Sequence, residues 1–347
     1  MSPIQKPTIY ARRSGVPRSA VIIDSVPGAL RELYFIEHPT EDEHTEGIET
    51  KVRSFIAGWE RETVWAYYPW RDTAVHIPDE EIYGLLRTAR NRNLITAEEQ
   101  KAYREGVVGI GGLSVGSLAV AALVATGGPR KMKLADPDTV GITNLNRLRA
   151  TLPDVGENKT VVAARSAWEV DPFLDLELLE EGIGKDTIDT FLSRPRLSVF
   201  VDEMDSIETK ILARERCKEA EIPVVMATDN GDSVIIDVER FDLERARPIF
   251  HGRLALRKLP SVMTRKDFIE LSNLIIDTSH FTPRQLASIA EVGKTLSGIP
   301  QLGTAAMLAG SAIAYVVRRI LTDAPLPSGR YVMSYEQTFT PPLSRAR

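Results

Sequence analysis

The sequence is short of cysteine, since Cys217 is the only one among 347 residues. One thiol cannot close an intramolecular disulfide, and it cannot supply the paired Cys-x-x-Cys ligands of a structural zinc site. We therefore expect no zinc and a reducing, cytoplasmic setting. The first residues, MSPIQKPTIYARRSG, lack the apolar core of a signal peptide, which predicts that the chain is not exported.

Neither sign of charge dominates, because 43 Lys and Arg stand against 48 Asp and Glu, a net charge of −5. This balance argues against a nucleic-acid partner held by bulk electrostatics. Long apolar runs are also scarce. Residues 106–128 and 295–317 are uncharged, but glycines interrupt the first and Pro300 and Gln301 interrupt the second. We read both as buried elements of a soluble core and expect no membrane partner.

Strand and helix patterns alternate regularly from about residue 105. Short apolar strands are predicted at Gly106–Ile110, Lys131–Ala135, Leu174–Leu179, Leu197–Val201 and Ile222–Ala227. Helical patterns separate them, which predicts parallel pairing through right-handed crossovers. The expected fold class is α/β, a doubly wound, mostly parallel, Rossmann-like sheet with an extra N-terminal region. Ligands of such sheets bind beyond the carboxyl ends of the strands.

The chain is expected to have two parts of different character. The first is an accessory region at 1–80, with substrate recognition as a candidate role. The second is a main domain at 81–347, which we expect to be nucleotide-binding over about 105–240 and substrate-facing over about 241–347. Thr96 and Glu99 have the spacing of a capping box and predict a helix start. Further helices are expected at Arg265–Leu274, Pro283–Leu296 and Leu302–Leu321, and a closing strand near Tyr331.

The first strand of the main domain runs into the sequence GIGGLSVGS and then into a helix. Gly109, Gly111 and Gly112 permit close backbone approach in this turn, which also contains Ser114. The N-terminus of the following helix, expected at Ser117–Thr126, presents free N–H groups to an anion. The next strand ends at Asp136, where an acid can accept hydrogen bonds from ribose hydroxyls. These features predict an adenine-nucleotide site, and by themselves they suit a dinucleotide and ATP alike.

Further motifs follow in a fixed order: DPDTVGITNLNRLR, DVGENK and VFVDEMDS. The set resembles the ThiF/MoeB/HesA superfamily, adenylating domains related to ubiquitin-activating enzymes. The pattern of that superfamily runs GxGGxG, D-x-D-x-V, S/T-N-L-N-R-Q, D-V-G-x-x-K and D-x-x-D-N. The resemblance covers roughly residues 85–335 and fits a bacterial branch without the CxxC zinc pairs of many relatives.

The resemblance implies roles for particular residues. It makes Asp136 the ribose-binding acid and gives the phosphate contacts to Asn144 and Arg147. It implies that Lys159 neutralises phosphate charge and that Asp205 holds Mg²⁺. ATP and Mg²⁺ are therefore the expected cofactors.

An upstream arginine of the superfamily reaches the ATP of the neighbouring subunit, which implies a homodimer. Arg90 is the best match for it here and Arg92 a weaker one. Three positions depart from the pattern. Ser114 stands at the sixth position of GxGGxG, in place of its fourth glycine, and Gly116 is displaced by two. Leu148 replaces the glutamine after N-L-N-R, and Ser206 replaces the final asparagine. Relatives also use the C-terminal third for a crossover loop and a second, substrate-facing sheet.

The implied activity is adenylylation of a carboxylate. The substrate is the C-terminus of a ubiquitin-like or sulfur-carrier protein, a peptide, or a small acid. A carboxylate is already nucleophilic, so its attack on ATP needs no general base. Cys217 lies in ARERCKEA, where we expect a small core residue. The acyl-adenylate would then pass to an external nucleophile without an enzyme thioester, and Cys217→Ser should leave activity largely intact.

Two alternatives remain open. A nicotinamide- or flavin-dependent oxidoreductase uses the same glycine turn but gives the N-L-N-R motif and Lys159 no role. A non-catalytic scaffold, like the inactive partner subunits of eukaryotic activating enzymes, would not need Arg147, Lys159 and Asp205 together. The five histidines show no metal-like spacing, and His251, near the expected crossover loop, is the one worth testing.

Overall fold

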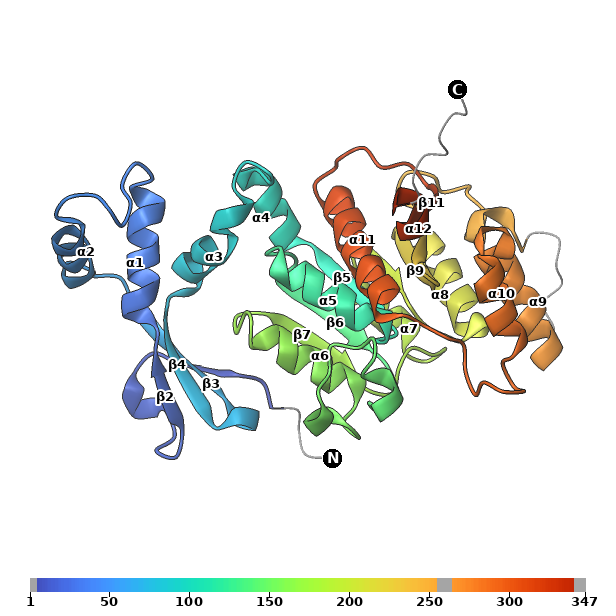
Figure 1. The fold of residues 1–347 in the computed structure, drawn as a ribbon, viewed down its shortest axis with the longest axis horizontal. Coiled ribbons are helices and arrows are strands. Elements are labelled where there is room, and N and C mark those ends of the chain that lie inside the picture. The colour runs from blue at the N-terminus through green and yellow to red at the C-terminus, as the bar shows by residue number, and fades with distance from the viewer. Residues whose placement is uncertain (1–4, 255–263, 340–347) are drawn as a thin grey trace, which may run out of the picture. The chain divides into compact units, whose positions relative to one another are not determined.

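The computed structural model describes residues 5–254 and 264–339. The chain forms two compact units, Met1–Lys101 with Ala167–Leu174, and Ala102–Ser166 with Asp175–Arg347. In Figure 1 the first unit runs from blue to cyan, apart from its green segment Ala167–Leu174, and the second runs from cyan to red. The role expected for residues 1–80 stays a prediction.

The first unit contains a four-stranded sheet in the order β1-β3-β4-β2. Its strands are β1 Thr8–Tyr10, β2 Val21–Asp24, β3 Thr63–Tyr68 and β4 Thr73–Pro78, and its helices are α1 Val26–Glu37, α2 Ile48–Ala57 and α3 Glu80–Thr88. β2 joins β4 in parallel, whereas the other two pairings are antiparallel. Leu30 and Leu33 of α1 are fully buried and belong to a core of this unit's own.

Helix α4, Ala97–Glu105, begins where the capping box predicts. The Thr96 N–H donates to Glu99 Oε2 at 2.9 Å, and the Glu99 N–H donates to Thr96 Oγ1 at 3.2 Å. The reciprocal bonds satisfy two N–H groups that the first turn of a helix leaves unpaired. This prediction is confirmed.

The second unit is built on a seven-stranded sheet in the order β11-β10-β9-β8-β5-β6-β7. The strands are β5 Val107–Gly111, β6 Lys131–Ala135, β7 Asp175–Leu179, β8 Val199–Asp202, β9 Val224–Asn230, β10 Ser233–Glu239 and β11 Gly329–Ser334. β9, β8, β5, β6 and β7 are parallel neighbours, and β10 and β11 are antiparallel. The predicted α/β class and mostly parallel sheet are confirmed.

Helices of the second unit follow the predicted alternation. They are α5 Val115–Ala125, α6 Lys159–Trp168, α7 Ile188–Ser193, α8 Ile207–Glu219, α9 Arg265–Ile276, α10 Pro283–Ala290, α11 Gly303–Leu321 and α12 Tyr335–Phe339. The predicted helix Pro283–Leu296 is too long, because the chain leaves α10 at Ala290 and Gly293 then adopts a φ of +82°. A left-handed residue of this kind ends a helix.

The closing strand predicted near Tyr331 is confirmed as β11, whereas the sequence patterns did not predict β10 or the antiparallel pairing at this edge. β10 is buried along its whole length and pairs with β9 through a two-residue turn at Gly231 and Asp232. Gly231 has a φ of +61°, which a tight hairpin of this kind requires. The expectation of a second, substrate-facing sheet is wrong for the described residues, because β10 and β11 extend the main sheet. The dipeptide Gly231-Asp232 is the hairpin signal that could have revealed this.

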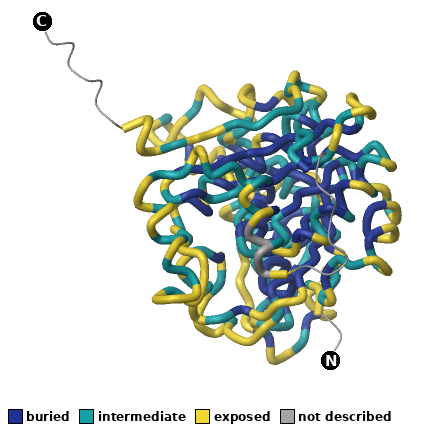
Figure 2. Tube along the Cα trace, turned by 90° about the vertical axis from the view of Figure 1, so that its right-hand side faces the viewer, coloured by how far each residue is buried: buried dark blue, intermediate teal, exposed yellow. Residues whose placement is uncertain are grey.

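Helix α11 is the one helix among the described residues that is long and apolar enough to cross a membrane. More than half of its apolar window is buried inside the protein, and the helix packs on α5, β9 and β10. A Cβ at Gly310 would lie 2.6 Å from the Leu118 carbonyl carbon, so the small residue lets α11 and α5 approach closely. These contacts support the interpretation as a core helix. Buried chain is dark blue in Figure 2, with exposed yellow chain around it.

Candidate functional site

The glycine turn connects β5 to α5 at the carboxyl edge of the sheet. Gly112 has a φ of +84°, and a Cβ there would lie 2.2 Å from the Glu203 carbonyl oxygen. Gly109 has a different role, because a Cβ on it would lie 2.3 Å from a Leu197 side-chain carbon within the core. Gly111 is buried at the end of β5. Gly112 therefore shapes the turn, and the assignment of the three glycines to a nucleotide stays a prediction.

Replacing Gly112 with alanine should destabilise the protein and weaken ATP binding. The left-handed backbone alone costs about 1–2 kcal/mol for a non-glycine residue, and the contact with Glu203 adds to that. Thermal unfolding and ATP titration calorimetry measure the two effects. Gly184→Ala is the control, because no heavy atom lies within 4 Å of a Cβ at that position. Equal behaviour of the two variants would contradict this account.

Asp136 follows β6 and braces the glycine turn. Its Oδ2 accepts the Leu113 N–H at 2.6 Å, and its Oδ1 accepts the Asp138 N–H at 2.8 Å. Burial raises the pKa of Asp136, and the two backbone donors and Lys159 oppose that shift. Both oxygens are thus engaged by the backbone, a structural role in addition to the ribose contact that the resemblance implies.

Lys159 begins α6 and is buried beside the same acids. Its Nζ lies 2.7 Å from Asp138 Oδ2 and 3.8 Å from Asp136 Oδ1. A lysine held in this way is a fixed positive charge next to the glycine turn. The structure therefore brings Lys159 and Asp136 together, as the order of the motifs suggested.

Arg147 lies at the N-terminus of α5. Its Nε donates to Ser114 Oγ at 3.2 Å, and its Nη1 donates to the Thr143 carbonyl at 3.2 Å. Asn144 has a local task, because its Oδ1 accepts the Gly141 N–H at 2.9 Å. A guanidinium and the free N–H groups of a helix start together favour an anion. This is the electropositive part of the candidate site.

The departures from the superfamily pattern have local explanations. Ser114 offers its hydroxyl to Arg147. Leu148 is buried against Val140 and Val162, where a glutamine would place a polar group. Ser206 caps α8, because its Oγ accepts the Thr209 N–H at 3.2 Å, a task that asparagine also performs.

Acidic side chains gather where β8 and β9 end. Asp205 is exposed in the loop after β8. Burial raises the pKa of Glu203 well above its ordinary value, and its Oε1 accepts the Ala227 N–H at 2.7 Å. Asp229 Oδ1 accepts Gln301 Nε2 at 3.1 Å. The sequence patterns did not single out Glu203, Asp229 or Gln301. For Glu203 and Asp229, the position near the end of a strand is the only signal that could have indicated a role.

A short chain of hydrogen bonds joins Asp229 to Arg147 through Gln301 and Asn146. Arg147 Nη1 donates to Asn146 Oδ1 at 3.0 Å, and Asn146 Nδ2 donates to the Gln301 carbonyl at 2.9 Å. A Cβ at Gly303 would lie 2.4 Å from the Asn146 carbonyl oxygen. The segment before α11 is therefore held against the N-L-N-R motif.

A buried ion network supports the loop that carries Asp205. Arg214 and Asp202 are fully buried, and Arg214 donates to Asp202 Oδ2 and, at 2.7 Å, to Glu239 Oε2. Lys210 Nζ lies 3.1 Å from Asp202 Oδ1, which also accepts the Met204 N–H. Burial alone would raise the pKa of Asp202, but Lys210 and Arg214 hold it below its ordinary value.

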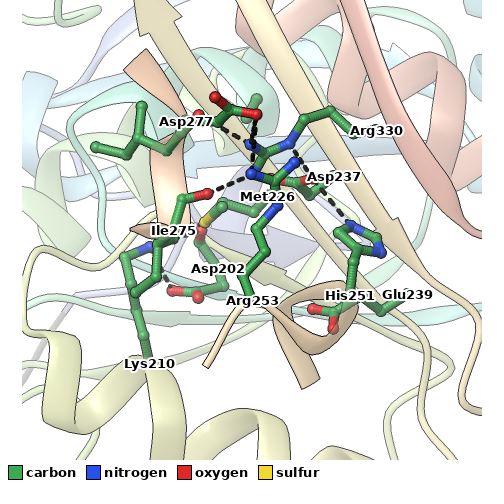
Figure 3. Close-up of polar contacts among 12 residues, drawn as sticks. Asp202, Lys210, Met226, Asp237, Glu239, His251, Arg253, Ile275, Asp277 and Arg330 are labelled. Carbon is green, nitrogen blue, oxygen red and sulfur yellow. Dashed lines mark hydrogen bonds and ion pairs between the residues drawn. The ribbon is translucent and has the colours of Figure 1, made fainter. Parts of the chain in front are cut away.

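His251 belongs to a second buried cluster, in which Asp237 lies between His251 and Arg330 (Figure 3). His251 Nε2 is 2.9 Å from Asp237 Oδ1, and Arg247 donates to Nδ1 at 2.8 Å. Because Arg247 can only donate, Nε2 carries the ring hydrogen. Phe250 and His251 have φ values of 50° and 55°. The cluster thus holds a strained turn in place, which is a structural role for His251.

Arg90 and Arg92 belong to the first unit. Both are exposed, and Arg90 lies in the 3-10 turn Ala89–Asn91. The structure contains one chain, so the contact of Arg90 with a neighbouring subunit's ATP and the homodimer stay predictions. In residues 5–254 and 264–339, no three His, Cys, Asp or Glu side chains gather as a metal site.

Cys217 is fully buried among apolar side chains of α7, α8 and the sheet, as predicted. Burial raises the pKa of its thiol well above the ordinary value, so it stays protonated and unreactive. Cys217→Ala should therefore retain catalytic activity, measured by the exchange assay described below. The hydroxyl of Cys217→Ser would cost about 1–3 kcal/mol of stability if it remained unpaired. Loss of activity in a folded Cys217→Ala protein would contradict this.

The geometry defines a class: an α/β protein whose glycine turn, strand-end acid and basic cluster lie at one edge of a mostly parallel sheet. The chain belongs to the ThiF family, whose model matches residues 88–340.

Two curated proteins show the relationship in sequence. Uncharacterized protein MT1398 of Mycobacterium tuberculosis (strain CDC 1551 / Oshkosh) is 40% identical over 269 residues, covering 77% of this chain and 37% of that protein. The tRNA threonylcarbamoyladenosine dehydratase of Bacillus subtilis is 33% identical over 138 residues, covering 40% of this chain and 52% of the dehydratase. The chain thus spans about a third and about half of these relatives.

Two solved structures show the same fold. E. coli MccB with MccA-N7isoASN matches with a TM-score of 0.51 and 17% identity, covering 89% of this chain and 84% of that one. The E. coli dehydratase TcdA in complex with AMP matches with a TM-score of 0.50 and 19% identity, covering 69% of this chain and 96% of that one. At such identities the likeness concerns the fold.

Proposed function

We propose that this protein is an ATP- and Mg²⁺-dependent adenylyltransferase that activates a carboxylate. The observation that carries the proposal is the contact of Arg147 with Ser114 at the N-terminus of α5. This contact places a guanidinium beside the free N–H groups of a helix start. The adjoining turn requires glycine at Gly112. An adenylating enzyme needs such a place for the phosphates of ATP.

The residues present suit the two expected ligands. The helix start and Arg147 would hold phosphate oxygens, and Lys159 would neutralise their charge. Asp205 would hold Mg²⁺, because this ion takes one or two carboxylates together with phosphate oxygens and water. Asp205 is exposed at the carboxyl edge of the sheet, where phosphates would lie. When bound, Mg²⁺ neutralises charge on the phosphates.

The chemistry demands positioning more than proton transfer. An oxygen of the substrate carboxylate forms a bond to the α-phosphorus, the bond to the bridging oxygen breaks, and pyrophosphate leaves. Arg147 and the α5 N–H groups stabilise the charge on the transferring group. Lys159, held by Asp138, keeps a positive charge in the same region.

The substrate class rests on the relatives. MccB was solved with MccA, and TcdA with AMP, so the fold accommodates an adenylate and an added substrate in those proteins. For this chain we propose a peptide or the C-terminus of a small carrier protein, with residues 1–80 contributing to its recognition. A homodimer in which Arg90 reaches the partner's ATP, and a cytoplasmic location, complete the proposal.

The test is carboxylate-dependent exchange of labelled pyrophosphate into ATP, over a panel of peptides, carrier proteins and small acids. Exchange with at least one carboxylate is the expected result. NADH binding without ATP binding would favour the oxidoreductase, and ATP binding without exchange would favour the scaffold.

A further inference from the structure

The carboxylate of Asp229 has one oxygen without a hydrogen-bond donor. Oδ1 accepts Gln301 Nε2 at 3.1 Å, whereas Oδ2 is buried and has no partner among the described residues. Leaving a buried carboxylate oxygen without a donor costs free energy, so such a group calls for a partner. A donor from a bound molecule would supply one.

The position of Asp229 connects it to the phosphate end of the site. Gln301, which holds its Oδ1, accepts a hydrogen bond from Asn146, and Asn146 is bonded to Arg147. Asp229 also lies one residue before the end of β9, the strand beside β8, and the loop after β8 carries Asp205. Asp229 thus lies next to the phosphate contacts, where the acyl end of an adenylate would be.

Adenylylation itself gives Asp229 no task. Another carboxylate next to Asp205 repels phosphate oxygens, and a substrate carboxylate needs no base to attack. The second half of the reaction differs. An amine that attacks the acyl-adenylate must lose a proton, and a carboxylate within hydrogen-bond reach can accept it.

We propose that Asp229 is the general base for transfer of the acyl group to an amine nitrogen. This inference rests on the proposed adenylylation and adds the class of the acceptor. The nitrogen lone pair forms a bond to the acyl carbon. The bond from that carbon to the AMP oxygen breaks, and AMP leaves with the electron pair. The proton from nitrogen goes to Asp229 Oδ2, while Gln301 keeps Oδ1 in place.

Burial and most of the groups around Asp229 act on its pKa in opposite directions. Burial raises the pKa of Asp229, and the hydrogen bond from Gln301 and the charge of Arg147 oppose the shift, whereas Asp205 adds to it.

The experiment compares two acceptors with one activated acid. A carboxylate that supports pyrophosphate exchange in the native protein is supplied with ATP and either ethylamine or hydrosulfide, and amide and thioacid are quantified. Hydrosulfide is already an anion near neutral pH and needs no base. In Asp229→Asn the ratio of amide to thioacid rate should fall about 10²-fold, the usual contribution of a general base.

Companion variants separate catalysis from folding. Gln301→Ala should lower the same ratio by about tenfold, because Oδ1 loses its orienting donor. Asp229→Glu should recover part of the amide rate. Asp232→Asn, at the exposed tip of the β9–β10 hairpin, is the matched control and should keep the native ratio.

Three outcomes would overturn the inference. An equal loss of both rates means that Asp229 is structural, and native rates with both acceptors mean that it takes no proton. Absence of exchange in the native protein overturns the proposed function, and the inference with it. That last result is distinct, because exchange precedes any contact with the acceptor.

Discussion

Replacing Arg147 with methionine is expected to slow carboxylate-dependent ATP–pyrophosphate exchange by about 10²–10³-fold, the usual effect of removing one preorganised donor from a developing charge. Methionine keeps much of the length of the side chain and removes its charge. The bond from Arg147 Nε to Ser114 Oγ at 3.2 Å fixes the guanidinium at the start of α5, so a flexible cation elsewhere cannot replace it.

The control for this prediction is Arg149→Met, which removes the same charge two residues further on from an exposed side chain. That variant should exchange at nearly the native rate. Lys159→Ala should also lose exchange, because it removes the charge that neutralises the phosphates. Asp205→Ala should lose it because Mg²⁺ loses its proposed ligand. Equal activity of Arg147→Met and Arg149→Met would remove Arg147 from the site.

The second large effect concerns stability. Arg214→Met should destabilise the protein by about 3–5 kcal/mol, because it leaves buried carboxylates without their cation. Asp202 and Glu239 are almost wholly inaccessible, and both bond to Arg214. Urea unfolding followed by circular dichroism measures the loss.

Arg216→Met is the matched control on the same helix, because that side chain is partly exposed and pairs with Glu219. A surface change of this kind is expected to stay within about 0.5 kcal/mol. If Arg214→Met were equally mild, the network would be dispensable.

The pH dependence of stability offers a second readout of the same network. The pKa of Asp202 is lowered in the folded state, so its stabilising contribution is present at neutral pH and is lost as the pH falls through that folded value.

Much of the fold follows from local patterns along the chain. Alternating apolar strands and helices fix the parallel part of the sheet, because each crossover has one favoured hand. The capping box at Thr96 depends on neighbouring residues alone, and it forms as expected. The prediction fails at the hairpin of β9 and β10, because a local turn signal does not show which sheet the added strand joins.

The candidate site divides in the same way. Asp136, Arg147, Lys159 and Asp205 could be named from ordered motifs, and the structure places the first three around the glycine turn. Asp229 and Gln301 could not be named, because 72 residues separate them and their contact needs α11 to lie on β9. No periodicity or spacing encodes such a meeting.

The sequence by itself thus determined the class of sheet, the glycine turn, the ThiF-type motifs and the inert position of the single cysteine. Only the tertiary structure decided which side chains meet across the carboxyl edge of the sheet: Asn146 with Gln301, Gln301 with Asp229, and Arg214 with Asp202 and Glu239. The physical reason is that hydrogen bonds and ion pairs act over a few ångströms in space. Folding brings together residues as far apart as the 155 positions that separate Asn146 from Gln301.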